Sequence, residues 1–175
     1  KNITTAEGGM LITKKTKIAE RVKNLRLHGL SRDAWKRYSM KGKYKSYDIF
    51  ETGFKYNLAN INAALGINQL KKVETFWKKR KKIWNFYNKN LNDLPIKLPP
   101  KISKNYKHAY HLYTLIIDNK KTKKTRNEMT DFLQKNQIGI GIHYNAIQTF
   151  EFYKDKVKFK NNDLKISNLV CKNIF

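Results

Sequence analysis

Cysteine, proline, arginine and acidic side chains are all scarce in this chain of 175 residues. Its one cysteine, Cys171, excludes an internal disulfide and is typical of a reducing compartment, so we expect a cytoplasmic protein. No apolar stretch approaches the roughly 20 residues that cross a bilayer, so we expect no membrane partner. Hydrophobic residues still make up 40% of the chain, which is enough for a packed core and argues against wholesale disorder.

Basic residues outnumber acidic ones by 38 to 13, and a formal net charge of +25 is typical of nucleic-acid binding. However, few of these basic residues are arginine, the residue that forms bidentate contacts with bases and phosphates. The lysines are dispersed along the chain with abundant Asn and Ile, a combination that AT-rich codon usage produces. We therefore expect solvated polar faces and no nucleic-acid partner, although a positive surface still attracts an anionic small substrate.

Common catalytic motifs are missing as well. The chain has no Walker loop, no Gly-x-Gly-x-x-Gly fingerprint and no Gly-x-Ser-x-Gly nucleophile turn. Its four histidines, at 28, 108, 111 and 143, stand apart from cysteines and clustered carboxylates, so we predict no metal site. Cys171 falls in a predicted helix and is interpreted as a structural thiol. The residues alone therefore lead only to a basic α/β chain.

The longest regular pattern runs from Gly53 to Leu91 without a proline. Apolar residues recur there at helical spacing, and Asn57 or Asn60 is placed to cap the first turn. The first half is small and apolar, whereas the second half is rich in Lys around aromatic residues. This change of character predicts a helix that leaves one domain and enters another.

Before this helix we expect a short buried strand at 10–13 and then a helix capped by Thr13 or Thr16 that stops at Gly29. Residues 30–52 have little periodicity and many aromatic side chains. A segment of this kind is either functional or a surface loop pinned by its aromatics, and both readings stay open.

After the long helix, residues 95–100 read as a proline-punctuated linker, followed by an alternation of strands and helices. The predicted strands are 110–118 and 140–144. One helix begins at a capping box of Thr125 and Glu128 and stops at Gly139, and a last helix is capped by Asp163. We place the domain boundary at 77, with 1–77 in a first domain and 78–175 in a small α/β domain.

Five blocks of sequence, taken in order, resemble the DegT–DnrJ–StrS family of sugar aminotransferases, which use pyridoxal 5'-phosphate (PLP). The first block reads Lys-Asn-Ile-Thr-Thr-Ala-Glu-Gly-Gly-Met, and the later ones include Leu-His-Gly-Leu-Ser-Arg-Asp-Ala-Trp and Gly-Phe-Lys-Tyr-Asn-Leu. The last two read His-Ala-Tyr-His-Leu-Tyr and Gly-Ile-Gly-Ile-His-Tyr. One block alone would be weak, but five in the right order over almost the whole chain are specific.

The resemblance implies the fold of the aspartate aminotransferase-like PLP enzymes, known as fold type I. Residues 1–77 would then be the C-terminal part of the large PLP-binding domain, and 78–175 the small C-terminal domain, incomplete at its end. The family's ring-pairing carboxylate, ring-stacking residue and near-side phosphate ligands precede the cofactor lysine. We therefore expect a chain cut at both ends that is not catalytic by itself.

Two residues match the family's cofactor-binding positions. Lys1 matches the lysine that binds PLP covalently and then moves a proton, which requires an amine that can be neutral near pH 7. Asn57 matches an asparagine that reaches the cofactor phosphate across a dimer interface, and an amide near a helix start suits an anion. A plain helix cap is the alternative for Asn57, and both roles can hold together.

His143 and Tyr144 match the start of the family's substrate-side segment. The family usually continues with a proline two residues after the aromatic, or a histidine four after it. Here Gln148 takes the place of that histidine, so the resemblance implies a substrate-side residue of altered chemistry, which leaves the substrate open.

The resemblance implies transfer of an amino group, with glutamate as the expected donor, to a keto carbon of a nucleotide-linked sugar. The cofactor would be PLP, and the enzyme a homodimer with shared active sites. Its product would enter surface polysaccharide, lipid A-type or glycosylated-metabolite synthesis. Two alternatives remain. One is a basic non-enzymatic domain that binds nucleic acid or an anionic surface. The other is the family's dehydratases, in which a histidine replaces the lysine, and Lys1 argues against that one.

Overall fold

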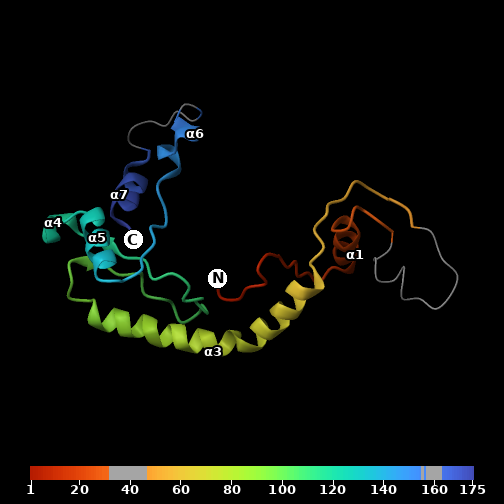
Figure 1. The fold of residues 1–175 in the computed structure, drawn as a ribbon, viewed down its shortest axis with the longest axis horizontal. Helices are drawn as coiled ribbons and strands as arrows, with labels where there is room; N and C mark the ends of the chain where they lie inside the picture. Colours follow the sequence, from red (N-terminus) through yellow and green to blue (C-terminus); the bar gives the residue numbers. More distant parts are fainter. Residues whose placement is uncertain (32–46, 155, 157–162) are drawn as a thin grey trace. The chain divides into compact units, whose positions relative to one another are not determined.

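The computed structural model describes residues 1–31, 47–154, 156 and 163–175. They form two compact units, one of Lys1 with residues 3–73 and the other of Asn2 with residues 74–175. The division falls inside helix α3 (Asn60–Asn90), between Val73 and Glu74 and a few residues before the predicted boundary (Figure 1). Among the described residues, no helix is long and apolar enough to cross a membrane.

Helix α1 (Thr16–Leu25) is the first helix of the first unit. The predicted threonine cap is wrong, because the helix follows Lys15 and has no side-chain cap. Thr13 instead accepts a hydrogen bond at 3.1 Å from the amide of Lys15, which makes a local turn before the helix. The expected stop at Gly29 comes a little late, since the helix ends at Leu25 and Arg26 is its cap.

Two glycines let the chain after α1 lie directly against the segment before α3. The backbone pairs at Leu27 with Lys55 and at Leu30 with Ile49. A β-carbon on Gly29 would lie 1.9 Å from the Glu51 carbonyl oxygen, and Gly29 also has φ +71°. A β-carbon on Gly53 would lie 2.1 Å from the Gly29 nitrogen. Glycine is therefore required at both positions for the two backbones to meet.

The predicted buried strand at 10–13 is wrong. These residues form no strand, and Met10, Leu11 and Ile12 are 82%, 57% and 90% exposed. A strand exists only where a neighbouring strand completes its hydrogen bonds, and no described segment pairs with this one. The apolar pattern thus identified a segment with buried-strand composition, but its partner is not among the described residues.

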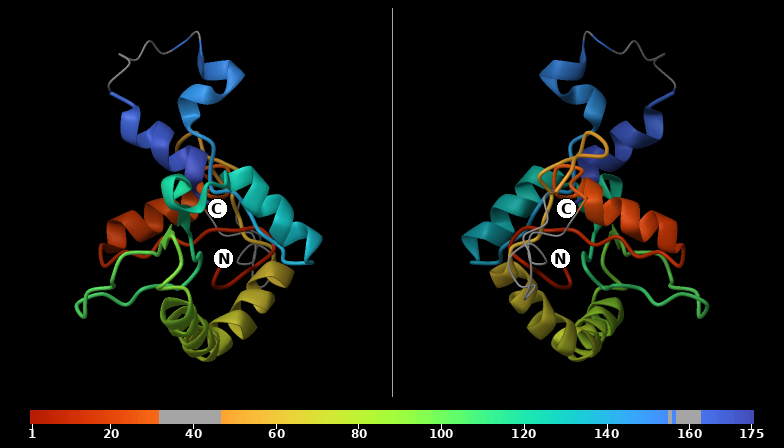
Figure 2. Two further views of the ribbon diagram at one scale, coloured as in Figure 1. Left: turned by 90° about the vertical axis from the view of Figure 1, so that its left-hand side faces the viewer. Right: turned by 90° about the vertical axis from the view of Figure 1, so that its right-hand side faces the viewer.

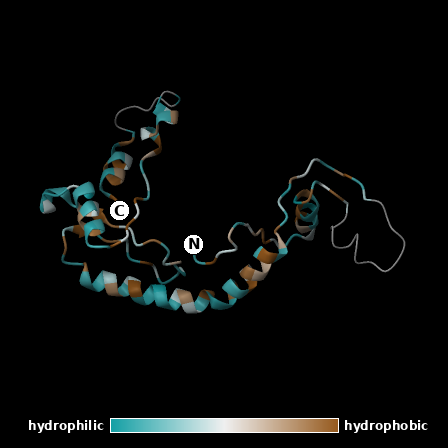
Figure 3. Ribbon diagram, in the orientation of Figure 1, coloured by the Kyte–Doolittle hydropathy of each residue, from teal (hydrophilic) through white to brown (hydrophobic). Residues whose placement is uncertain are grey.

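The long helix is confirmed as α3, which begins at Asn60, one of the two positions proposed for its cap, and ends at Asn90. Figure 3 shows the predicted change of character, with apolar ribbon at its start and mainly hydrophilic ribbon along the remainder. Within the described chain, Trp84 is its one buried residue, at 6% exposed. Neither Asn57 nor Asn60 makes a side-chain hydrogen bond to another described residue, so the predicted cap is not formed.

An aromatic cluster forms the core of the second unit around Trp84. The Trp84 ring lies 4.9 Å from the ring of His108, 5.4 Å from that of Tyr110 and 4.7 Å from that of Tyr113. The indole of Trp77 donates to the His108 carbonyl at 2.7 Å. Edge-to-face packing of this kind stabilises beyond simple burial. Residues 108–113, which lead toward the sheet, therefore pack against α3.

The sheet is smaller than expected. Strands β1 (Ile96–Lys97) and β2 (Ile116–Ile117) pair antiparallel, with Ile96 opposite Ile117, and Ile116 also bridges to Ile174. The predicted strand at 110–118 is thus correct only at 116–117, because Tyr110 takes φ +50°, which is incompatible with a strand. The predicted strand at 140–144 is wrong, since it has no paired neighbour among the described residues.

Short helices complete the unit: α4 (Asn119–Thr122), α5 (Arg126–Lys135), the 3-10 helix η1 (Ile147–Thr149), α6 (Glu151–Lys154) and α7 (Lys165–Asn173). The predicted capping box is confirmed, with Glu128 N–H donating to Thr125 Oγ1 at 3.2 Å and Thr125 N–H to Glu128 Oε2 at 2.7 Å. The Asp163 cap is wrong, because α7 follows Leu164. Gly139 is not the stop of α5, whose chain turns at Gln137 with φ +62°.

Figure 2 shows that the segment of η1 and α6 lies beside α7 in the second unit. Cys171 lies in a helix, α7, as predicted, and is half-buried rather than buried. The predicted aromatic loop at 30–52 falls largely on residues 32–46, which lie outside the described residues.

Candidate functional site

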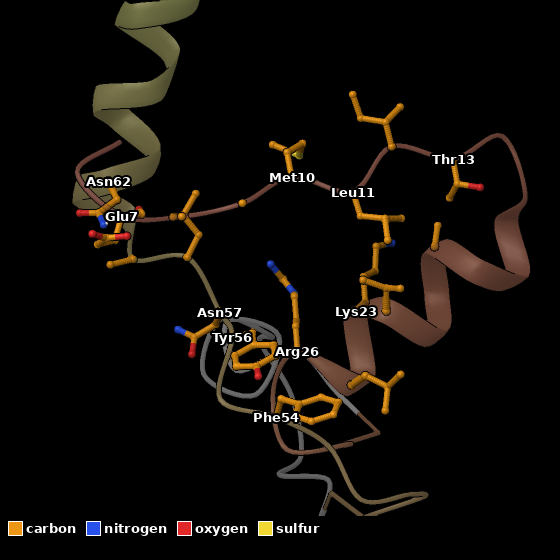
Figure 4. Close-up of a pocket in the computed structure, with 18 residues that line it drawn as sticks. Glu7, Met10, Leu11, Thr13, Lys23, Arg26, Phe54, Tyr56, Asn57 and Asn62 are labelled. Atoms are coloured by element: carbon orange, nitrogen blue, oxygen red, sulfur yellow. Dashed lines mark hydrogen bonds between the residues drawn. The ribbon is translucent and has the colours of Figure 1, made fainter. Parts of the chain in front are cut away.

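The first unit contains a cleft of about 1130 Å³ (Figure 4). Its walls come from the loop of residues 7–13, from one face of α1, and from the segment 54–59 that leads into α3. The first stretch overlaps the end of the first block of the family resemblance and the third stretch overlaps the third block, whereas α1 lies outside the blocks. Two of the three walls therefore contain residues that the resemblance singles out.

Small residues bring the 7–13 loop close to α3. A β-carbon on Gly66 would lie 2.9 Å from Thr5 Cγ2, and one on Gly8 would lie 2.9 Å from Leu58 Cδ1. The Asn62 side-chain amide donates to the Glu7 carbonyl at 3.2 Å, which ties the loop to the first turn of the helix. Of the small residues in α3 that the sequence singled out, Gly66 thus allows this close approach to Thr5.

Asn57 lies on the wall of the cleft and is exposed (Figure 4). Its side-chain amide makes no hydrogen bond to another described residue. The backbone on its N-terminal side is fixed, because Tyr56 N–H donates to the Arg26 carbonyl at 2.8 Å and the Phe54 and Tyr56 rings stack at 4.9 Å. The amide is therefore presented to solvent from a held backbone, which is the arrangement that an anion-binding donor requires.

Arg26, Phe54 and Tyr56 also line the cleft, and sequence reasoning did not select them. Figure 4 shows the Arg26 side chain extending across the cleft toward the 7–13 loop. A cationic side chain in the cleft makes it suitable for an anionic group. The signal for these residues was weak, since Phe54 and Tyr56 lie inside a recognised block without an implied role, and Arg26 directly precedes the block that begins at Leu27.

An ion pair holds α1 against the segment before α3. Arg21 donates to both carboxylate oxygens of Glu51, at 3.2 Å from Nε and 2.8 Å from Nη2. The hydrogen bond from Arg21 lowers the pKa of Glu51, and the same contact raises the pKa of Arg21. The bidentate geometry fixes orientation as well as distance. The pair therefore supports the cleft from outside it.

Lys1 is exposed and is not among the residues that line the cleft. Its neighbour Asn2 donates from its side-chain amide to the Ala109 carbonyl at 2.8 Å, inside the second unit. The structure thus leaves the Lys1 amine accessible. It does not bring Lys1 and Asn57 together in one cleft.

The predicted substrate-side residues all lie in the second unit. His143 is half-buried, Tyr144 is 70% exposed, and their rings meet edge to face at 4.7 Å across a cis peptide bond. The Gln148 amide donates to Asn168 Oδ1 at 2.8 Å. Of these three side chains, Tyr144 is the one that faces solvent most fully. The described residues contain no cluster of His, Cys, Asp or Glu that could hold a metal ion.

Solved structures of sugar aminotransferases share this fold. The chain superposes on PseC of Helicobacter pylori, an aminotransferase of pseudoaminic acid biosynthesis, with a TM-score of 0.75 and 25% identity, covering 99% of this chain and 44% of that one. It also matches the PMP form of the putative sugar aminotransferase Spr1654 from Streptococcus pneumoniae, with a TM-score of 0.80 and 23% identity, over 99% and 44%. The chain thus has the fold of part of a fold-type-I PLP-dependent transferase.

The family follows from the sequence profile. The profile of the DegT/DnrJ/EryC1/StrS aminotransferase family matches residues 1–175, and the chain belongs to this family. It is 35% identical over 164 residues to the spore coat polysaccharide biosynthesis protein SpsC of Bacillus subtilis and 45% identical over 163 residues to the uncharacterized protein MJ1066 of Methanocaldococcus jannaschii. In both comparisons the match covers 93% of this chain and 42% of the relative.

The residues present fit the cofactor that this family uses. A covalent link to PLP requires a primary amine that the aldehyde can reach, and the Lys1 side chain is exposed. A phosphate requires hydrogen-bond donors, and the Asn57 amide has no competing partner among the described residues. The Lys1 amine and the Asn57 amide are therefore chemically suited to the aldehyde and to the phosphate of the cofactor.

Proposed function

We propose that the full-length protein is a PLP-dependent aminotransferase that acts on a keto carbon of a nucleotide-linked sugar, with glutamate as the amino donor. The observation that carries this proposal is the family match over residues 1–175, which includes the positions of Lys1 and Asn57. The similarity to SpsC supports a sugar substrate and a role in polysaccharide biosynthesis. A nucleotide-linked acceptor would also suit the positive net charge of +25, because its phosphates are anionic.

In this proposal Lys1 has two tasks. Its Nζ would bind the cofactor covalently in the resting enzyme and, once released by the amino donor, would move a proton at the substrate carbon that bears the nitrogen. Both tasks require the neutral amine. PLP, when bound, supplies the electron sink that makes this carbon acidic.

Asn57 would hold the cofactor phosphate through its side-chain amide, and its presentation from a held backbone supports this role. Since Lys1 and Asn57 do not share one cleft within this chain, we propose that they meet across the interface of a homodimer. His143 and Tyr144 would contact the acceptor, with Tyr144 offering its exposed ring. We place the enzyme in the cytoplasm, in keeping with its single half-buried cysteine.

The test is to identify the lysine that carries PLP. The full-length protein, incubated with PLP and reduced with borohydride, should carry one cofactor on Lys1, as located by peptide mass mapping. Lys1→Ala should lose this label and lower transamination by roughly 10²–10⁴-fold, the usual contribution of a proton-transfer residue, while circular dichroism stays unchanged.

Lys14→Ala is the matched control, because Lys14 is another exposed lysine of the first unit. This variant should keep both the label and the activity. Labelling of another lysine in the wild type, or full activity in Lys1→Ala, would show that Lys1 is not the cofactor lysine.

A further inference from the structure

The side chain of Gln148 is engaged inside the second unit. Its Nε2 donates to Asn168 Oδ1 at 2.8 Å and lies 3.5 Å from Ser167 Oγ. Gln148 belongs to η1, whereas both partners belong to α7, so the contact joins segments 20 residues apart. The site is partly buried, which limits competition from water and strengthens the bond.

Helix α7 is itself fixed at its C-terminal end. Arg126 Nη1 donates to the Cys171 carbonyl at 2.6 Å, and Asn173 is only 7% exposed. Leu115 and Phe175 exchange backbone hydrogen bonds of 2.8 and 3.0 Å. Gln148 therefore attaches its own segment to a helix that is already held by α5 and by the chain beside β2.

The segment that Gln148 attaches is the one that carries Tyr144. Between the two residues, Ala146 is 7% exposed, and its carbonyl accepts from the Thr149 hydroxyl at 2.7 Å and from the Thr149 amide at 2.9 Å. The chain from 146 to 149 is therefore a compact turn with little freedom of its own. When Gln148 is held on α7, the backbone that carries the exposed Tyr144 is held in position as well.

We propose that Gln148 is a positioning residue, which holds the 143–147 segment on α7 through Asn168 and does not itself touch the substrate. This inference rests on the proposed function, in which His143 and Tyr144 contact the acceptor sugar. For the Nε2 of Gln148 to turn to a ligand, it would have to leave Asn168, and the partly buried oxygen of Asn168 would lose its donor. The replacement of the family's usual histidine thus changes how the segment is held.

Asn168 provides the test, because it lies on α7, outside the segment that would face the sugar. In the full-length enzyme, Gln148→Ala and Asn168→Ala should each raise KM for the acceptor by a similar factor, roughly three- to tenfold, with a smaller effect on kcat. The double variant should be no worse than the more affected single variant, because both changes remove one contact. An increase of KM in Gln148→Ala alone, with Asn168→Ala unchanged, would instead identify Gln148 as a substrate ligand and overturn the proposal.

Two further variants control for simple loss of side chains. Gln148→Asn combined with Asn168→Gln keeps the pair and its combined reach, and should return KM to within about twofold of the wild type. Gln134→Ala removes an exposed glutamine of α5 and should leave KM unchanged. Failure of the exchanged pair to improve on the single variants would count against a Gln148–Asn168 contact as the cause.

Thermal unfolding gives a readout that does not depend on activity. The midpoints of the two alanine variants should fall by similar amounts, and the double variant should match them rather than show their sum. If the enzyme is active but the midpoint decrease of the double variant equals the sum of the two single decreases, the positioning role is overturned and the proposed function is not. An enzyme with coupled midpoints but no sugar transamination would overturn the proposed function, and the role in substrate positioning with it.

Discussion

At the scale of single residues, the ionised Glu51 side chain binds Arg21 of α1, the helix that forms one wall of the cleft. It joins α1 to the segment before α3 through two hydrogen bonds from Arg21, of 3.2 and 2.8 Å. These bonds lower the pKa of Glu51, so its folded-state pKa lies below the value of about 4.3 that a Glu has in an unfolded chain. A group of this kind stabilises the fold above the unfolded pKa and loses that contribution as the pH falls through the folded pKa.

We therefore predict that Glu51→Gln lowers the unfolding midpoint of the full-length protein at pH 7. The difference from the wild type should be constant above about pH 5 and should shrink as the pH falls below about 4. Thermal unfolding at a series of pH values measures both. In an Arg21→Gln background the substitution should have little effect, because the partner is gone. A difference that grows on acidification would contradict the role given to this pair.

At the scale of elements, the contact between residues 25–30 and 49–56 depends on backbone atoms that almost touch. His28 N–H donates to the Phe54 carbonyl at 2.9 Å, and Phe54 N–H donates to the Leu25 carbonyl at 2.7 Å. A β-carbon on Gly53 would meet three backbone atoms within 2.8 Å, and backbone cannot rotate aside as a side chain does. This pairing carries Phe54 and Tyr56 to the cleft, so its geometry matters for the site as well as for stability.

Gly53→Ala should accordingly destabilise the full-length protein by about 1–3 kcal/mol or more, the usual cost of forcing atoms into a packed site. Gly139→Ala is the matched control, because a β-carbon there meets nothing within 4 Å. Urea unfolding of both variants measures the difference. Equal stability of the two would show that the close approach at Gly53 can relax at little cost.

Local signals predicted the elements that depend on neighbouring residues, and failed for those that depend on distant ones. The capping box of Thr125 and Glu128 lies within one helical turn, and its composition determines its geometry. The segments 10–13 and 140–144 looked like strands, but a strand requires a paired neighbour that no local pattern reveals. The bond between Gln148 and Asn168 escaped prediction for the same reason, since it joins residues 20 apart.

At the scale of the whole molecule, the candidate site is divided. The family blocks correctly identified the family, because each block is a short sequence with a specific pattern. The blocks could not show whether Lys1 and Asn57 of one chain meet, because that depends on the assembly. Asn57 lies on the cleft wall, Lys1 does not line that cleft, and a dimer that shares its sites would reconcile the two positions.

Subunit mixing distinguishes shared from separate sites in the full-length protein. If Asn57 serves the partner's cofactor, a mixed dimer of an Asn57→Ala subunit and a Lys1→Ala subunit has both defects in one site and an intact second site. Random pairing of equal amounts makes half of the dimers mixed, so about a quarter of the wild-type activity should return, although each variant alone is nearly inactive. Activity after denaturation and refolding of the mixture measures this.

The reverse arrangement provides the control. A subunit that carries both substitutions, mixed with a wild-type subunit, should give mixed dimers with one defect in each site and therefore no activity beyond that of the wild-type dimers. If Asn57 serves its own subunit instead, the two results exchange: the single-variant mixture stays inactive, and the mixture with the doubly substituted subunit keeps one intact site per mixed dimer. The pair of measurements thus assigns Asn57 to one cofactor or the other, because each arrangement predicts activity in one mixture and its loss in the other.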